Sequence, residues 1–470
     1  MRSMRSRKPL LAVVSVFIAV LVFLISGWKR DSDRYNVIVV SLDTLRADHL
    51  GILGFSKWDI SPNIDQLASD GVVFENAFST ASVTTASHMA IFTGLYPLEH
   101  RISDVNAISA RKEELPGFLD TKIKTLPQLF RESGFRTVRF VNSRDYFLDA
   151  SIGFGRGFDE LFPFGMDSLA STKAISDWVK ENSGKPFFAF IHSKRPHGPF
   201  LFSDRELEAA RLKGIINKNY SGPIVSSFEK WSELTEKNFW ANNFIPGIVP
   251  DCYFFDDKVR RNVSGDVLMH RQLYALGVHK ADEYLGRIVS ALKESGIYEK
   301  TLILVTSDHG EQLLERGSFS HIHLFREETH VPLVIRFPLD LRKGIREARV
   351  ASDVQSVDIL PTLAKVSGVS MPENISGKDL SPLWRKEKSE LREYSHGWNS
   401  FSLIRRSAFL RSKKWVLVQE NGNFSLFDRE NDAEEKINVA KSNPEVLQKM
   451  EEKLDEFRMI GTSFDPERSR

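Results

Sequence analysis

Four short runs rich in apolar, β-branched or aromatic residues limit most strongly the folds open to this chain of 470 residues. They lie at residues 37–42, 136–141, 187–191 and 302–306, and helical patterns separate them. Runs this short and this apolar are typical of strands whose two faces are both buried, as in parallel sheets. The sequence therefore predicts an α/β fold with a mainly parallel central sheet flanked by helices.

Polar residues capable of binding a metal follow three of these runs. Asp43 comes directly after the first run, His192 after the third, and Asp308 and His309 just after the fourth. Ligands of open α/β sheets bind beyond the carboxyl ends of the strands. Carboxylate and imidazole groups bind Zn²⁺ or Mn²⁺, whereas Ca²⁺ prefers the carboxylates. A divalent cation site is one hypothesis; helix caps or turn residues are the alternative.

The C-terminal part has a different pattern. Alternating residues around Asn421-Gly422 predict a β-hairpin, and residues 444–459 predict a terminal helix. We therefore expect a catalytic domain over residues 35–385 and a small α+β subdomain over residues 386–470.

The N-terminus predicts a membrane anchor. Residues 9–28 carry no charge and follow four basic residues, and a helix of this length can cross a hydrocarbon layer of about 30 Å. Residues 1–34 are thus predicted to form a cytoplasmic tip and a transmembrane signal anchor. The protein would be a single-pass membrane protein whose catalytic domain lies outside the cytoplasm, in a periplasmic, extracellular or lumenal space.

The overall composition argues against two other classes of protein. The 64 basic and 62 acidic residues nearly balance, so no nucleic-acid partner is predicted. A single cysteine, Cys252, excludes an internal disulfide and a zinc site built from several cysteines.

Residues 82–97, Ser-Val-Thr-Thr-Ala-Ser-His-Met-Ala-Ile-Phe-Thr-Gly-Leu-Tyr-Pro, resemble the signature of the sulfatase family within the alkaline phosphatase superfamily. That signature is Cys/Ser-x-Pro-Ser-Arg followed by Thr-Gly-x-Tyr-Pro, and counting back from Thr93-Gly94 puts Thr84 at the nucleophile position. Further similarities, in family order, are Leu45-Arg46-Ala47-Asp48, Gly157-Phe158-Asp159, Pro196-His197-x-Pro199, Ser307-Asp308-His309-Gly310-Glu311, Val331-Pro332-Leu333 and Leu426-Phe427-Asp428. The resemblance implies an alkaline-phosphatase-like core.

Departures from the family signature shape the predicted chemistry. Active sulfatases oxidise the motif Cys or Ser to formylglycine, but oxidation of a threonine gives a ketone instead of that aldehyde. Other superfamily members, the nucleotide pyrophosphatases and the phosphoethanolamine transferases, resemble this chain in using a metal-bound threonine. This resemblance implies that Thr84 is a metal-bound nucleophile. The implied metal ligands are Asp43, Thr84, Asp308 and His309.

The resemblance also implies roles for other polar residues. His197 is predicted to protonate the departing alcohol, and His88 stands where the family has an arginine that steadies the nucleophile and the metal. The predicted substrate-binding residues are His321, His323 and Arg46. Arg46 has a structural alternative, an ion pair with Asp48.

These observations together predict a metal-dependent hydrolase or transferase of phosphate, phosphodiester or sulfate esters carried by a glycan or a lipid. One alternative is an arylsulfatase-like sulfuric ester hydrolase that keeps the family specificity. A second alternative, from another class, is an inactive protein that binds sulfated or phosphorylated glycans.

Overall fold

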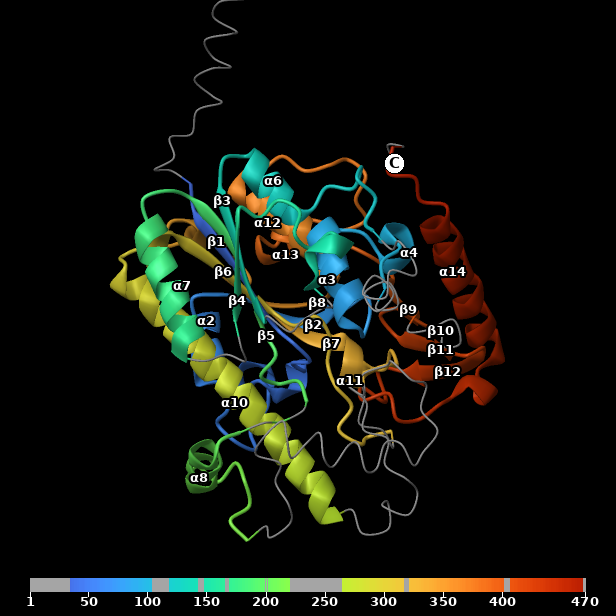
Figure 1. Ribbon diagram of the computed structural model, residues 1–470. Coiled ribbons are helices and arrows are strands. Elements are labelled where there is room, and N and C mark those ends of the chain that lie inside the picture. Colours follow the sequence, from blue (N-terminus) through green and yellow to red (C-terminus); the bar gives the residue numbers. More distant parts are fainter. Residues whose placement is uncertain are drawn as a thin grey trace, which may run out of the picture.

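The computed structural model describes residues 34–103, 118–142, 148–164, 169–198, 200, 202–219, 264–316, 321–400 and 406–467. Within these residues the chain forms a sheet of eight strands and a second sheet of four (Figure 1). The strands of the large sheet, in spatial order, are β4 (Glu160–Phe164), β3 (Arg136–Asn142), β5 (Phe187–Ser193), β1 (Asn36–Leu42), β6 (Thr301–Thr306), β7 (His330–Arg336), β2 (Gly71–Phe78) and β8 (Arg349–Gln355).

The large sheet is mainly parallel, as the sequence predicts. The four apolar runs form the neighbouring strands β3, β5, β1 and β6, which pair in parallel. Among the described strands of the large sheet, only β7 runs antiparallel to its neighbours β6 and β2. The carboxyl ends of β5, β1 and β6 therefore lie side by side at one edge of the sheet.

Helices cover both faces of this sheet. Val37 and Val39 of β1 belong to one hydrophobic core and Ile38 and Val40 to the other, as the two-residue period of a strand requires. The first core includes side chains of α3 (Thr84–Thr93), α6 (Leu126–Glu132), α12 (Ile359–Ser367) and α13 (Ser381–Trp384). The second includes side chains of α2 (Pro62–Ala68), α7 (Leu169–Asn182), α8 (Asp204–Leu212) and α10 (Ser264–Glu294).

The C-terminal sheet is antiparallel, in the order β12-β11-β10-β9. Its strands are β9 (Ser395–Ser400), β10 (Arg406–Arg411), β11 (Trp415–Glu420) and β12 (Asn423–Asp428), and helix α14 (Pro444–Thr462) packs on it. The predicted hairpin joins β11 to β12, and Asn421 and Gly422 have φ values of 48° and 84°. Such positive φ values are typical of a type I′ turn. Two short helices of the larger domain, α4 (Pro97–His100) and α11 (Arg326–Thr329), lie on its side toward the C-terminal sheet (Figure 1). The domain boundary near residue 385 stays a prediction.

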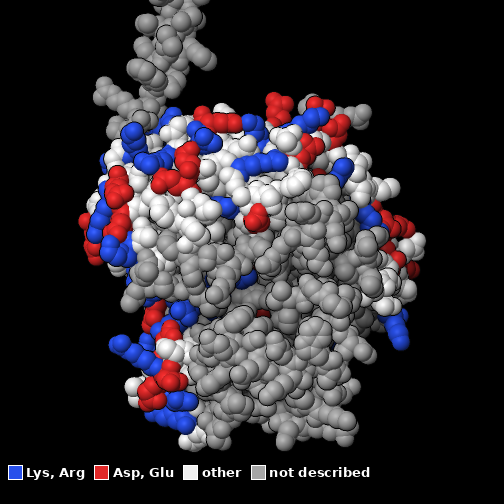
Figure 2. Space-filling model, viewed as in Figure 1, with Lys and Arg blue, Asp and Glu red and all other residues white. Residues whose placement is uncertain are grey.

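The membrane prediction rests on residues that the structure does not describe. No helix within the described ranges is both long and apolar enough to cross a bilayer. Residues 9–28 lie outside those ranges, so the anchor stays a prediction without structural support. On the face shown in Figure 2, the described basic and acidic side chains are interspersed, in keeping with the balanced charge of the sequence.

Candidate functional site

The carboxyl ends of β1, β5 and β6 bring several polar side chains together. Asp43 directly follows β1, and Asp308 lies two residues after the end of β6. Helix α3 begins at Thr84, which is buried at 2% exposure. The site thus lies where parallel α/β sheets usually bind ligands.

The four predicted metal ligands converge around one imidazole nitrogen. His309 Nε2 lies 3.4 Å from Asp308 Oδ2, 3.9 Å from Asp43 Oδ1 and 3.5 Å from Thr84 Oγ1. Ligand atoms of Asp43, Asp308 and His309 all lie within 4.8 Å of one another. The predicted convergence is therefore present in the structure.

Hydrogen bonding fixes which nitrogen of His309 has the lone pair. His309 Nδ1 lies 2.9 Å from the carbonyl oxygen of Gly310, which can only accept, so Nδ1 is the protonated nitrogen. The lone pair on Nε2 consequently accepts from the Thr84 hydroxyl and faces one carboxylate oxygen each of Asp43 and Asp308. Among the described residues, neither oxygen of Asp43 nor Oδ2 of Asp308 accepts a hydrogen bond. Buried acceptors that face one another repel unless a cation lies between them, so this donor set fits a divalent metal ion.

The electrostatics of the cluster suit the same interpretation. Burial raises the pKa of Asp308, and the charge of Asp43 adds to this effect. Burial also acts to raise the pKa of Asp43, but His197 and Lys194 outweigh it and hold that pKa well below its usual range. Burial lowers the pKa of His309 to about 4. Its imidazole is therefore neutral near pH 7 and keeps the lone pair that a metal ligand needs.

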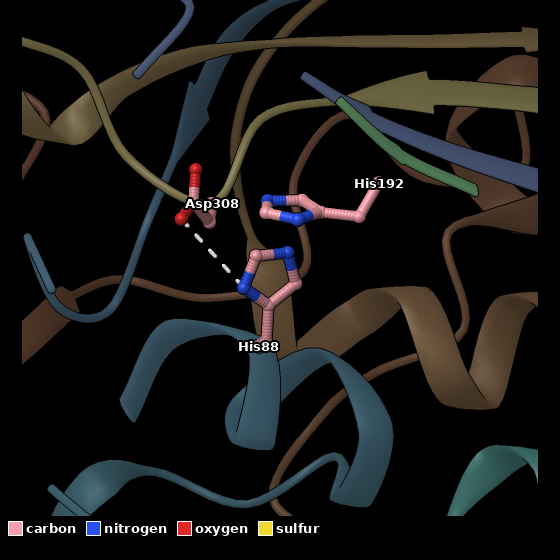
Figure 3. Close-up of side chains that lie close together, drawn as sticks. All are labelled: His88, His192 and Asp308. Atoms are coloured by element: carbon pink, nitrogen blue, oxygen red, sulfur yellow. Dashed lines mark ion pairs between the residues drawn. The ribbon is translucent and has the colours of Figure 1, made fainter. Parts of the chain in front are cut away.

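His88 fixes the first turn of α3 behind this cluster (Figure 3). Its Nδ1 lies 2.9 Å from the backbone oxygen of Thr84 and 3.6 Å from Asp308 Oδ2, and its Nε2 lies 2.9 Å from Ser41 Oγ. The ring of His192 is perpendicular to it at 4.9 Å. His88, His192 and Asp308 have ligand atoms close together, but Nδ1–H of His88 donates to Thr84 and its Nε2 accepts from Ser41. This second group therefore does not suit a metal.

Two more predicted histidines lie beside the cluster. His321 stacks on His309 with ring centroids 4.4 Å apart, and the ring of His197 meets His321 edge-on at 5.3 Å. His321 Nδ1 donates to the backbone oxygen of Ser82 at 3.0 Å. Both rings are thus placed next to the predicted nucleophile and metal ligands.

The other two predicted substrate-binding residues have partners elsewhere. His323 pairs with Glu420 of β11. The buried guanidinium of Arg46 forms ion pairs with Asp48 at 2.6 Å and with Glu315 at 2.7 Å. The structural alternative for Arg46 is thus present in the structure, while substrate binding by Arg46 and His323 stays a prediction.

Two further nitrogen groups lie beside Asp43: His192, which follows a predicted strand but received no role from the sequence, and Lys194, which the sequence interpretation missed. His192 Nε2 lies 3.5 Å and Lys194 Nζ 3.7 Å from Asp43 Oδ2. The register of the sheet explains this placement, because Ser41 of β1 pairs with His192 of β5. Residues 37–42 and 187–191 thus form neighbouring strands, and this pairing places His192 and Lys194 beside Asp43.

Thr44, next to Asp43, has an unusual backbone conformation. Its φ of 59° is rare for a β-branched residue and indicates local strain. In this conformation its backbone N–H donates to Asp308 Oδ1 at 3.3 Å. The strained residue therefore links the ends of β1 and β6.

Comparison with known proteins matches most of the chain. The profile described as "Sulfatase" matches residues 35–369, and the profile "N-sulphoglucosamine sulphohydrolase, C-terminal" matches residues 314–459. Arylsulfatase K of Bos taurus is 26% identical over 92% of this chain and 82% of its own length. A phosphonate monoester hydrolase of Agrobacterium radiobacter has a similar fold, with a TM-score of 0.70, 23% identity, and coverage of 91% of this chain and 96% of its own. A protein whose structure was solved in complex with its substrate D-glucosamine-2-N,6-O-disulfate also has a similar fold, with a TM-score of 0.68 and 19% identity. The similarity covers 93% of this chain and 100% of that protein chain.

Proposed function

The chain belongs to the sulfatase family of ester hydrolases, and from this membership we propose that it cleaves an anionic ester with Thr84 as the nucleophile. The observation that carries this proposal is the His309 lone pair that faces Thr84 Oγ1 and two carboxylate oxygens. A protein that only binds glycans has no need of such a buried donor set. The inactive alternative is therefore disfavoured.

Asp43, Asp308, His309 and Thr84 would hold the divalent cation, which is Zn²⁺, Mn²⁺ or Ca²⁺. The chemistry that such a cation supplies when bound is activation of a hydroxyl group and neutralisation of negative charge on the ester. His88 keeps Thr84 in place through its backbone oxygen. The positive charge of Lys194 lies close enough to attract an anionic substrate to this end of the sheet.

The proposed first step transfers the acid group to Thr84. The hydroxyl loses its proton to water, and Thr84 Oγ1 forms a bond to phosphorus or sulfur. The bond from that atom to the alcohol oxygen breaks, and the oxygen takes a proton from His197. Because His197 Nδ1 faces the carbonyl oxygen of Gly198, Nε2 is the nitrogen from which this proton leaves. Water then hydrolyses the ester on Thr84, or an acceptor alcohol takes the group in a transferase.

The proposed substrate is a phosphate, phosphodiester or sulfate ester on a glycan or a lipid. Threonine cannot form formylglycine, which favours phosphorus over conventional sulfatase chemistry. Sulfuric ester hydrolysis is the second candidate, because the relatives include N-acetylglucosamine-6-O-sulfatase of Bacteroides thetaiotaomicron. In either case we propose a catalytic domain that acts outside the cytoplasm.

The test is turnover of nitrophenyl sulfate, nitrophenyl phosphate and bis-nitrophenyl phosphate by variants of neighbouring threonines. Thr84→Ala should abolish turnover, and Thr84→Ser should retain part of it because the attacking oxygen remains. Thr85→Ala is the matched control, since it removes a hydroxyl from the next residue of the same helix, and it should stay active. Full activity of Thr84→Ala would refute nucleophilic catalysis by this residue.

A further inference from the structure

Strand β9 of the C-terminal sheet lies against the loop that leads into α3. The backbone N–H of Trp398 donates to the backbone oxygen of Thr80 at 2.9 Å. A Cβ atom on Gly397 would lie only 2.5 Å from that same oxygen, so the approach depends on glycine. The edge strand thus touches the segment that ends at Thr84.

One side chain of β9 reaches deeper into this contact. Asn399 is buried at 4% exposure. Its Nδ2 donates to Ser82 Oγ at 2.6 Å and to the backbone oxygen of Ile322 at 3.3 Å, and its Oδ1 accepts from the backbone N–H of Ser82 at 3.0 Å. Both the oxygen and the nitrogen of the Asn399 amide therefore form hydrogen bonds, and Ser82 is a partner of each.

The two segments that Asn399 joins carry residues of the proposed site. Ser82 lies two residues before Thr84, and Ile322 follows His321. Ser82 and His321 are also joined directly, because Ser82 Oγ donates to the backbone oxygen of His321 at 2.7 Å and His321 Nδ1 donates to that of Ser82 at 3.0 Å. Asn399 thus closes a buried network that sets Thr84 and His321 relative to each other.

We propose that Asn399 is a positioning residue for the reaction, through which the C-terminal sheet completes the catalytic site of the larger domain. The proposal rests on the proposed function of Thr84. Removing the amide leaves the buried N–H of Ser82 without its acceptor, and the loop must shift to satisfy it. A displacement of about 1 Å at a reacting group can reduce the rate by about 100-fold.

The test compares Asn399→Ala with Asn438→Ala, and measures kcat, KM and the thermal midpoint for each. Asn438 is the control for lost side-chain hydrogen bonds, because its Oδ1 accepts from the backbone N–H groups of Leu426 and Ala440 at 3.1 and 3.0 Å within the C-terminal subdomain, although the residue is exposed. Both variants should lower the midpoint, and Asn438→Ala should lower it less because Asn438 is exposed. Only Asn399→Ala should lower kcat, by about 10- to 100-fold, with a smaller change in KM. A kcat within twofold of wild type would overturn the proposal.

Two further variants keep the test decisive if Asn399→Ala does not fold. Asn399→Asp keeps the shape and the acceptor for Ser82 but cannot donate to Ile322, and Ser82→Ala removes the hydroxyl from the network. Each should lower kcat, and unchanged kcat in both would overturn the proposal. Thr84→Ala separates the two claims. If it is inactive while Asn399 variants keep full kcat, only the positioning role fails; if it is fully active, the proposed nucleophile fails.

Discussion

Replacing Asp308 by asparagine should stabilise the protein when divalent metal is removed. Asp43 and Asp308 are both completely buried, and three of their four carboxylate oxygens accept no hydrogen bond from the described residues. Without a cation between them, two negative charges repel each other in a medium of low polarity. Asp308→Asn removes one charge and keeps an oxygen that accepts the N–H of Thr44.

The expected gain follows from the distance between these groups. Two unit charges no more than 4.8 Å apart repel by at least about 3.5 kcal/mol at an effective dielectric constant of about 20. Lys194 offsets part of this repulsion, so we expect the free energy of unfolding to rise by about 1–3 kcal/mol. Burial and Asp43 raise the native pKa of Asp308 above its unfolded value, so the repulsion is present at neutral pH and vanishes as pH falls below the unfolded pKa. The gain should therefore shrink as the pH approaches about 4.

Urea unfolding in EDTA at pH 7.5 and pH 5 measures this effect, and added Zn²⁺, Mn²⁺ or Ca²⁺ should stabilise the wild type but not Asp308→Asn. The matched control is Asp282→Asn. Asp282 is equally buried, but its carboxylate accepts hydrogen bonds from Asn63 and from the backbone N–H of Ile64 at the start of α2. Burial raises the pKa of Asp282 to about 6, but N–H donors face both of its oxygens, and the amide introduced by Asp282→Asn would turn a further N–H toward one of them. The control should therefore lose stability. If Asp308→Asn loses as much stability in EDTA as Asp282→Asn does, and added metal does not stabilise the wild type, the inferred cation site is wrong.

Three further predictions concern other parts of the molecule. His197→Ala should reduce kcat by about 10²- to 10⁴-fold for alkyl esters and far less for nitrophenyl esters, whose leaving group needs no proton; equal losses in a leaving-group series would contradict the assigned acid. Burial lowers the native pKa of His100 and of His396 to about 3, so the unfolded chain alone takes up these protons as pH falls below about 6.5. The contribution of these two neutral histidines to the free energy of unfolding should be fully present above that pH. Below it, the free energy of unfolding should fall by up to about 1.4 kcal/mol per pH unit for each histidine. A thermal midpoint that stays constant from pH 7.5 to 5 would contradict this prediction. Deletion of residues 1–34 should give a folded, active protein that needs no detergent, and aggregation of this truncated chain would mean that the segment belongs to the fold.

The centre of the sheet could be predicted from the sequence, but its far side could not. Strands β1, β5 and β6 are buried along their whole length and therefore consist mostly of apolar residues, whereas β3 adds two arginines to its apolar residues. Strand β8 lies at the edge of the sheet, is half exposed and has the sequence Arg-Val-Ala-Ser-Asp-Val-Gln. Because it contains so many polar residues, it does not form an apolar run that predicts a strand. The antiparallel direction of β7 also leaves no mark in its sequence, because direction is set by the connection and the pairing.

The candidate site was predictable where a motif carries the chemistry. Asp43, Asp308 and His309 follow strands, and the resemblance to the sulfatase signature identified Thr84. His192 also follows an apolar run, but no motif gave it a role, and Asn399 carries no such mark. Their roles depend on which strands become neighbours and on the contact between two sheets, which only the three-dimensional structure reveals.

The central claim is that Thr84 itself attacks the ester, and the most direct measurement is to trap the product of that attack. Acid quenching during turnover of a nitrophenyl ester, followed by proteolysis and mass spectrometry, should show a phosphoryl or sulfuryl group on the peptide that contains Thr84. Fragmentation should assign it to Thr84 rather than Thr85, and the modified peptide should be absent from Thr84→Ala. An unmodified peptide in an enzyme that turns over normally, together with full activity of Thr84→Ala, would contradict the account.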